Sequence, residues 1–259
     1  DIENQQNPYN GSEIWNDDFY DTDNPPKRHH YIGIASTALG ENVKAQDPWS
    51  VAIGRECEVD SNSRNSIAIG WSSTISTPYF GSNLGHSSLA LGHHSQIISS
   101  YDCLAMGYYA RIKNESIRSV AMGRNITIDG SPDSFVFGSG QSQDDVSNCL
   151  YNNIPRSFMV GFESKGPALF VSGGSATSTG NTSKVGIGLS TPVNTLDVRG
   201  KVVIGSGATY AGDADAPDNG LIVEGQTVIG GTTAVSGSAL TVSGTGFFIG
   251  GSNWTTSDR

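Results

Sequence analysis

The sequence predicts an all-β fold built from short stacked strands, and three observations support this class. The chain of 259 residues contains 33 glycines, and only 15% of its residues are charged. A five-residue motif of small and apolar residues that ends in glycine recurs through the central part of the chain. A different motif, also ending in glycine, recurs near the C-terminus. Regular repeats of short apolar segments are typical of structures in which each repeat buries its apolar face against its neighbours.

Residues 1–31 are the first of four expected segments and take no part in the repeats. They are polar and acidic, with a few aromatic residues and the turn-forming run Asn24-Pro25-Pro26. Runs rich in proline and asparagine mark turns and loops. We interpret this segment as an extended connector from an upstream domain. A docking segment that packs its aromatic residues on a neighbouring chain is the alternative.

Residues 32–165 are expected to form a head of stacked strands. The motif reads Ser, apolar, small, apolar, Gly, as in residues 66–70 (SIAIG), and a second short alternation follows most copies. Because successive side chains of a strand point to opposite faces, Ile67 and Ile69 share one bulky face and the small residues share the other. The final glycine permits a corner that a Cβ would prevent. The motif glycines are Gly40, Gly54, Gly70, Gly92, Gly107, Gly123, Gly138 and Gly161.

The spacing of these glycines indicates how the strands are joined. Most of them lie roughly 14–16 residues apart, as one coil of a repeat structure requires, and two longer intervals hold insertions. Coils this short bury their apolar faces only by stacking, so we predict a narrow parallel β-roll or β-solenoid. Neither face of the motif strand is charged. We therefore expect trimerisation around a long axis to cover part of the outer wall, and the pattern leaves open which face lines that axis.

The motif, as in residues 50–54 (SVAIG), resembles the head repeat of trimeric autotransporter adhesins over about residues 32–165. This resemblance implies a homotrimer of left-handed parallel β-rolls. That family also has a neck, a coiled-coil stalk and a β-barrel membrane anchor, and none of these follows the repeats here. A bacterial trimeric surface adhesin or appendage subunit is therefore kept as the alternative function.

A second repeat begins at residue 185, after an expected linker over residues 166–184. Residues 185–200 (VGIGLSTPVNTLDVRG) resemble a motif common in phage tail fibres. Leu and Val at positions i and i+2 place one apolar face inward, which a single hairpin cannot bury. We therefore expect residues 185–259 to form an intertwined, trimeric, β-prism-like shaft. The element Leu-x-Val-x-Gly stands at residues 196–200, 221–225 and 240–244.

The chain ends in Ser257-Asp258-Arg259, which resembles the start of the intramolecular chaperone domain of phage fibres and spikes. Such a domain cleaves itself off after trimer assembly. Together with the two repeats, the resemblance implies a structural and host-attachment segment of a homotrimeric phage tail fibre. It further implies a virion location, docking to other tail or fibre proteins, and contact with a cell-surface glycan or protein.

Candidate receptor-binding residues lie in and near the first of two insertions, 76–87 and 139–156. Loops that project from a rigid scaffold often carry function. Rings accompanied by Asn and His side chains can stack on a sugar and bind its hydroxyls, whereas the alternative is that they only cover exposed edges of the roll. Trp71, His93, His94 and Tyr101 lie near the same insertion. The receptor-binding candidates are Tyr79, Phe80, Asn83, His86, Tyr108 and Tyr109.

Composition argues against several other partners. The 15 basic residues are scattered and the net charge is −10, so no nucleic acid partner is expected. No segment reaches the roughly 18–20 apolar residues that span a bilayer, so no membrane insertion is expected. The cysteines Cys57, Cys103 and Cys149 form no CxxC motif and are interpreted as buried thiols.

Enzymatic and metal chemistry are not expected either. Adjacent histidines on a strand point to opposite faces, so His93-His94 is not expected to hold a metal, and no cofactor is expected. A polysaccharide-degrading tailspike is the second alternative function, because such enzymes use paired carboxylates. Glu56 and Glu58 share a strand face, but no cleft-forming pair stands out in the sequence. We therefore expect a protein that is not an enzyme.

Overall fold

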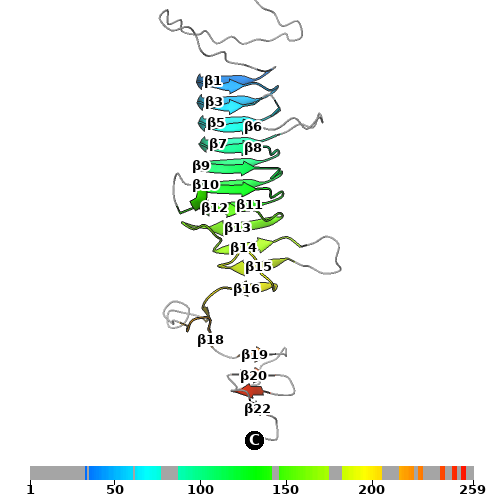
Figure 1. Ribbon diagram of the computed structural model, residues 1–259, viewed down its shortest axis with the longest axis vertical. Coiled ribbons are helices and arrows are strands. Elements are labelled where there is room, and N and C mark those ends of the chain that lie inside the picture. The colour runs from blue at the N-terminus through cyan, green and yellow to red at the C-terminus, as the bar shows by residue number, and fades with distance from the viewer. Residues whose placement is uncertain are drawn as a thin grey trace, which may run out of the picture. The chain divides into compact units, whose positions relative to one another are not determined.

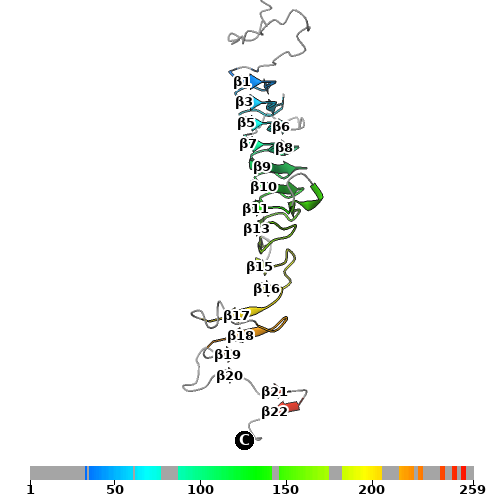
Figure 2. The same ribbon diagram turned by 90° about the vertical axis from the view of Figure 1, so that its left-hand side faces the viewer.

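The computed structural model is an all-β structure (Figures 1 and 2). Within its described part, the only helical segment is the 3-10 turn η1 (Val146–Asn148), and we find no helix with the length and hydropathy to cross a bilayer. The chain divides into two compact units, Asp1–Asp197 and Val198–Arg259, and each is treated by itself. The described residues are 33, 35–60, 62–76, 87–141, 146–174, 183–205, 216–224, 227–229, 240–242, 247–249 and 252–254.

The first unit contains one large, mostly parallel sheet, as the repeat predicts. Its main ladder holds the motif strands, which pair in register so that each motif glycine lies opposite the next. Figure 1 shows these strands stacked in chain order. The main ladder consists of β1 (Thr37–Glu41), β3 (Val51–Arg55), β5 (Ile67–Trp71), β7 (Leu89–His93), β9 (Leu104–Lys113), β10 (Val120–Asp129), β11 (Phe135–Ser139) and β13 (Ser157–Gly161).

A second parallel ladder runs beside the main one and is built from the short alternations that follow the motif. The chain thus alternates between the two ladders, and one passage through both makes one coil. The C-terminal halves of β9 and β10 belong to this second ladder. Its other strands are β2 (Lys44–Ala45), β4 (Glu58–Val59), β6 (Thr74–Ser76), β8 (Gln96–Ile98) and β12 (Leu150–Asn152).

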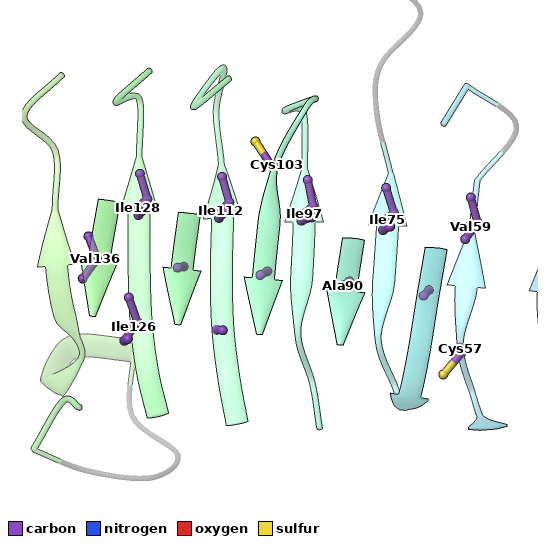
Figure 3. Packing of buried hydrophobic residues seen from close by; sticks show 14 of the residues in the cluster. Cys57, Val59, Ile75, Ala90, Ile97, Cys103, Ile112, Ile126, Ile128 and Val136 are labelled. Carbon is purple, nitrogen blue, oxygen red and sulfur yellow. The ribbon is translucent and has the colours of Figure 1, made fainter. Parts of the chain in front are cut away.

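The small face of the motif strand points into the coil. Ala68, Ala90 and Ala105 in the main ladder are completely buried, and so are the isoleucines that the second ladder directs inward. Figure 3 shows Ile75, Ile97, Ile112 and Ile128 in a row along the stack. In the coils of β5, β7 and β9 the interior holds one isoleucine of the second ladder opposite one alanine, whereas later coils also bury Ile126, Val136 and Met159. The bulky residues of the motif therefore lie outside, where Ile67 and Ile69 are half-buried.

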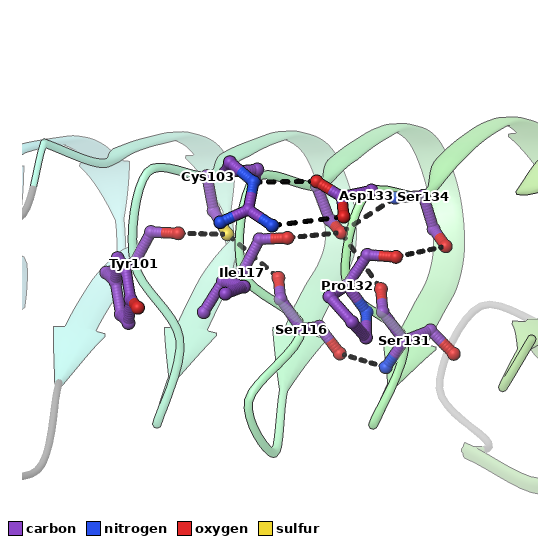
Figure 4. A network of polar contacts seen from close by, with 10 residues as sticks. Tyr101, Cys103, Ser116, Ile117, Ser131, Pro132, Asp133 and Ser134 are labelled. Carbon is purple, nitrogen blue, oxygen red and sulfur yellow. Dashed lines mark hydrogen bonds and ion pairs between the residues drawn. The ribbon is translucent and has the colours of Figure 1, made fainter. Parts of the chain in front are cut away.

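Buried serines satisfy the backbone between coils. The N–H of Ser88 donates to Oγ of Ser66 at 3.2 Å, and the N–H of Ser131 donates to Oγ of Ser116 at 3.0 Å. Figure 4 shows the second contact. In the same coils, Nε of Arg118 lies 2.7 Å from a carboxylate oxygen of Asp133. Each such hydroxyl gives a buried backbone N–H group a hydrogen-bond partner.

The sheet does not end at residue 165. β13 pairs antiparallel with β14 (Leu169–Ser172), and β14 pairs antiparallel with β15 (Lys184–Ile187). Part of the expected linker 166–184 is therefore a sheet strand, and β16 (Leu196–Val198) completes the path. The physical reason is that the last coil of a parallel stack leaves an unpaired edge and an open core. The antiparallel strands cover both, and Phe170 is buried there.

The described residues of the second unit form three separate two-stranded sheets. β17 (Val202–Ile204) pairs parallel with β18 (Leu221–Val223), and β19 (Thr227–Ile229) pairs parallel with β20 (Leu240–Val242). β21 (Phe247–Ile249) pairs antiparallel with β22 (Ser252–Trp254). The Leu-x-Val elements of the second repeat are thus strands, as the sequence predicts.

Candidate receptor-binding surface

The structure brings together two of the six candidate receptor-binding residues. Tyr79, Phe80, Asn83 and His86 lie outside the described residues. Tyr108 and Tyr109 are adjacent in β9, and three rings from two earlier coils join them. We call this set the aromatic corner, and it comprises Trp71, His93, His94, Tyr108 and Tyr109.

Strand register places these rings side by side. Trp71, His93 and Tyr108 each directly follow a motif glycine, and they are partners in the parallel ladder of β5, β7 and β9 (Figure 1). His94 and Tyr109 come one residue later in the same coils. Residues far apart in the sequence therefore become neighbours along the stack.

The five rings form two columns, one of His93 and Tyr108 and one of Trp71, His94 and Tyr109, whose ring planes are nearly perpendicular. His93 and Tyr108 stack at 4.8 Å with an interplanar angle of 3°, and His94 and Tyr109 stack at 4.7 Å with an angle of 21°. The columns are nearly perpendicular to each other, since Tyr108 and Tyr109 make an angle of 71°. Trp71 is inclined like His94, at 30° to it. Stacked and edge-to-face contacts each stabilise such a cluster by about 0.5–1.5 kcal/mol.

An arginine stands over a ring at each end of the aromatic corner. The guanidinium of Arg55 lies 5.3 Å from the Trp71 ring centre, and that of Arg111 lies 5.6 Å from the Tyr109 ring centre. Arg55 also faces two carboxylates, Glu41 at 3.5 Å and Glu56 at 3.6 Å. Arg111 has no carboxylate partner among the described residues, and it donates to Asn125 at 2.7 Å and to Thr127 at 3.2 Å.

Glu56 is held beside the aromatic corner by hydrogen bonds. The Ser72 hydroxyl donates to its carboxylate at 2.9 Å. This bond, supported by the Trp71 indole, keeps the pKa of Glu56 below its ordinary value. Glu56 is therefore ionised at neutral pH, and its charge offsets that of Arg55. At the other end of the corner, no carboxylate of the described residues pairs with Arg111.

Two further features of the aromatic corner concern exposure. Trp71 is 45% exposed, so part of its ring is open to solvent, whereas the other four rings are half-buried. Nδ1 of His93 is buried and has no hydrogen-bond partner in the described part of the chain. A buried imidazole nitrogen without a partner costs free energy, so packing in the corner stabilises this arrangement.

The backbone at the aromatic corner adopts a left-handed conformation. The position two residues after the motif glycine is left-handed in several coils. Its φ is 57° at Asn42 and 52° at Asn125, and the rings His94 and Tyr109 have nearly the same values, 53° and 55°. Asparagine tolerates this region, whereas a bulky residue is strained in it. Glu56, Ser72 and Glu163 occupy the equivalent position of other coils in the same conformation, and the rings His94 and Tyr109 occupy it in the coils of β7 and β9.

A second candidate surface is the apolar stripe, defined as the residues one and three positions before each motif glycine. These side chains point out of the coil and follow one another in register along the main ladder. Leu39 is 58% exposed, Phe135 is 49% exposed and Phe158 is 41% exposed. The residues directly before the glycines include Ile53, Ile69, Leu91, Met106, Met122 and Phe137.

No family model, curated protein or solved structure matches this chain. The two surfaces are therefore interpreted from their geometry.

The other groups that the sequence singled out are not brought together. Glu58 pairs with Lys44 at 3.3 Å, whereas Glu56 binds Ser72. Within the described residues, no cluster of three or more His, Cys, Asp or Glu side chains is arranged to hold a metal.

The cysteines are free and buried, as interpreted from the sequence, and burial raises the pKa of Cys103 to about 11.

Sequence reasoning missed the two arginines of this site. No sequence motif marks a guanidinium that lies over an aromatic ring, because the contact depends on how the coils stack on one another. For Arg55 the usable signal was the position directly after the motif glycine, which is Arg55, Trp71, His93, Tyr108 and Arg124 in consecutive coils.

Proposed function

We propose that this chain is a structural and host-attachment segment of a homotrimeric phage tail fibre. Its first unit is the head, in which three left-handed parallel β-rolls lie side by side, and its second unit is part of an intertwined, β-prism-like shaft. The observation that carries the proposal is the apolar stripe.

The stripe supports a trimer because it is continuous and uncharged. A soluble monomer rarely exposes a contiguous apolar patch of more than a few hundred Å². Here the stripe follows the main ladder from Leu39 in β1 to Val160 in β13. Three copies that turn these faces toward a common axis bury all of them, and closed rotational symmetry leaves no copy unpaired.

The second unit supports the same assembly. Isolated two-stranded sheets are at best marginally stable in water. Leu221 is 61% exposed, Ile204 is 55% exposed and Ile229 is 54% exposed in the single chain. Strands from neighbouring copies would complete these sheets and cover the exposed side chains.

Light scattering of the full chain tests the proposal. We expect a mass three times the 27.2 kDa of one chain, resistant to SDS at room temperature. Leu91→Asp places a carboxylate in the centre of the stripe and is expected to dissociate the trimer, because an unpaired buried charge is costly. Gln96→Asp adds the same charge to the second ladder and is the matched control. A folded wild-type monomer would contradict the proposal.

Attachment is the second part of the proposal, and the aromatic corner supports it. Rings with polar neighbours on a rigid scaffold are suited to a cell-surface glycan or protein. The expected location is the virion. Antibodies against the purified chain should label virions at the tail and block adsorption to host cells. Labelling of a bacterial surface in the absence of phage would instead favour the trimeric adhesin.

A further inference from the structure

We infer that the aromatic corner binds an oligosaccharide that carries a carboxylate group, with Trp71 packing on a sugar ring and Arg111 pairing with the carboxylate. The inference rests on the proposed attachment function and specifies its ligand.

The first step concerns the choice of residues at the corner. Where the first coil has Asn42 and a later coil has Asn125, the middle coils have His94 and Tyr109 in the same left-handed conformation. A residue held in a sparsely populated region costs on the order of 1–3 kcal/mol. Asparagine would remove much of that cost, so fold stability alone does not account for the rings. Glu56, Ser72 and Glu163 adopt the same conformation at the equivalent position, so the coil geometry imposes the strain, and the feature particular to this corner is that two of these positions carry rings.

The second step concerns the surface that these rings present. Trp71 is 45% exposed, although Arg55 covers part of its ring. A half-exposed indole whose N–H is directed to Glu56 offers an apolar ring surface with polar groups beside it. The carbon-bound hydrogens of a pyranose pack on such a surface while its hydroxyls bind the neighbouring polar groups.

The third step concerns charge. The chain carries a net charge of −10, and most arginines of this region face acids. Arg111 has none among the described residues, although Asn125 and Thr127 fix its guanidinium. Among the described residues, Nη1 has no hydrogen-bond partner and Nη2 has one. A guanidinium that is already positioned binds a carboxylate through two parallel hydrogen bonds.

The fourth step concerns length. Trp71 lies in β5 and Arg111 lies in β9, with the β7 coil between them. Neighbouring strands are about 4.8 Å apart, so these side chains are separated by about 10 Å along the stack. One sugar ring does not span that distance, whereas a disaccharide or longer chain does. The ligand therefore runs along the coils.

Calorimetry with the full chain tests the inference. The acidic probes are trigalacturonate and sialyllactose, and the neutral counterparts are maltotriose and lactose. We expect at least one acidic probe to bind about tenfold more tightly than its counterpart. Trp71→Ala and Arg111→Gln should each weaken that binding about tenfold or more, with Arg111→Lys in between. Arg199→Gln, at an exposed arginine of the second unit, is the matched control.

The same samples are measured by light scattering. If the wild-type chain binds neither acidic probe, or if Trp71→Ala and Arg111→Gln bind as well as the wild type, the inference is wrong. If these variants instead lower the assembly mass while the wild type binds no probe, the aromatic corner is a contact between copies, and the inference is again overturned. A trimer that binds no saccharide would contradict the inference about the aromatic corner but not the proposed fibre function. A monomer that binds an acidic probe would contradict the proposed trimeric fibre but not the saccharide site.

Discussion

A Cβ placed on Gly70 would lie 1.9 Å from the carbonyl oxygen of Gly92 in the next coil. The φ of Gly70 is 128°, in a region that other residues rarely adopt. The same contact recurs from Gly40 through Gly138, each glycine meeting the next at 1.8–2.1 Å. The repeat therefore requires glycine for two reasons, backbone conformation and the close approach of successive coils.

Gly70→Ala is expected to lower the free energy of unfolding by at least about 2 kcal/mol, because it combines backbone strain with a clash against main-chain atoms. Urea denaturation followed by circular dichroism measures the change. Gly166→Ala is the control, since a Cβ there meets nothing within 4 Å. Equal stability of the two variants would show that the glycine ladder does not require glycine.

The sequence predicted the parallel stack because one short motif repeats at a spacing that suits a coil. The sequence did not show which face of the motif strand points inward. Ala68 and Ile69 lie on opposite faces and are both apolar, so either face could be buried. The second ladder decides this in the coils of β5, β7 and β9, where its isoleucine lies opposite an alanine of the main ladder, whereas later coils bury Val136 and Met159 at the alanine position. The antiparallel cover was missed because β14 belongs to no repeat and because β15, at the start of the second repeat, was assigned to the shaft.

The candidate site was predictable only in part. Tyr108 and Tyr109 were recognised as aromatic residues near an insertion. Their contacts with His93 and His94 follow from register, which pairs His93 with Tyr108 across an intervening segment. Arg111 could not be found in this way, because its role depends on a cation–ring distance.

Ser66→Ala is expected to destabilise the head by about 1–3 kcal/mol. The hydroxyl of Ser66 accepts the N–H of Ser88, and removing it leaves that buried donor without a partner. Cys103 replaces serine in the same ladder and hydrogen-bonds through its thiol, so Ser66→Cys should cost less than Ser66→Ala. The midpoints of urea unfolding measure both. Thr191→Ala removes an exposed hydroxyl and should change the midpoint little.

Trp49→Asn is expected to stabilise the head by about 0.5–1 kcal/mol. Trp49 has a φ of 57° and is 57% exposed, so it is strained and gains little from burial. The equivalent position of the next coil is Asn65, with a φ of 54°. Thermal unfolding measures the gain. Trp71→Asn is the comparison, because Trp71 is not left-handed and should lose stability. A loss at Trp49 as well would indicate a contact made by its indole.

Asp47 makes the stability of the first coils depend on pH. Its side chain is buried, its Oδ2 has no partner among the described residues, and desolvation raises its pKa from 3.8 to about 6. Arg64 opposes this shift and Asp60 adds to it. Because the pKa is higher in the folded chain than in the unfolded chain, the folded chain binds more protons between these values. The free energy of unfolding therefore falls as the pH rises from about 4 to above 6.

Asp47→Asn is accordingly expected to raise the free energy of unfolding by about 1–3 kcal/mol at pH 7.5. At pH 4 the substitution should change this free energy little, because the Asp47 carboxyl of the folded wild-type chain is already protonated there. Urea titrations at several pH values between 4 and 8 measure the difference. Asp218→Asn is the matched control, since the Asp218 side chain is 92% exposed. If the gain from Asp47→Asn were the same at pH 4 and pH 7.5, it would come from packing and not from the buried charge.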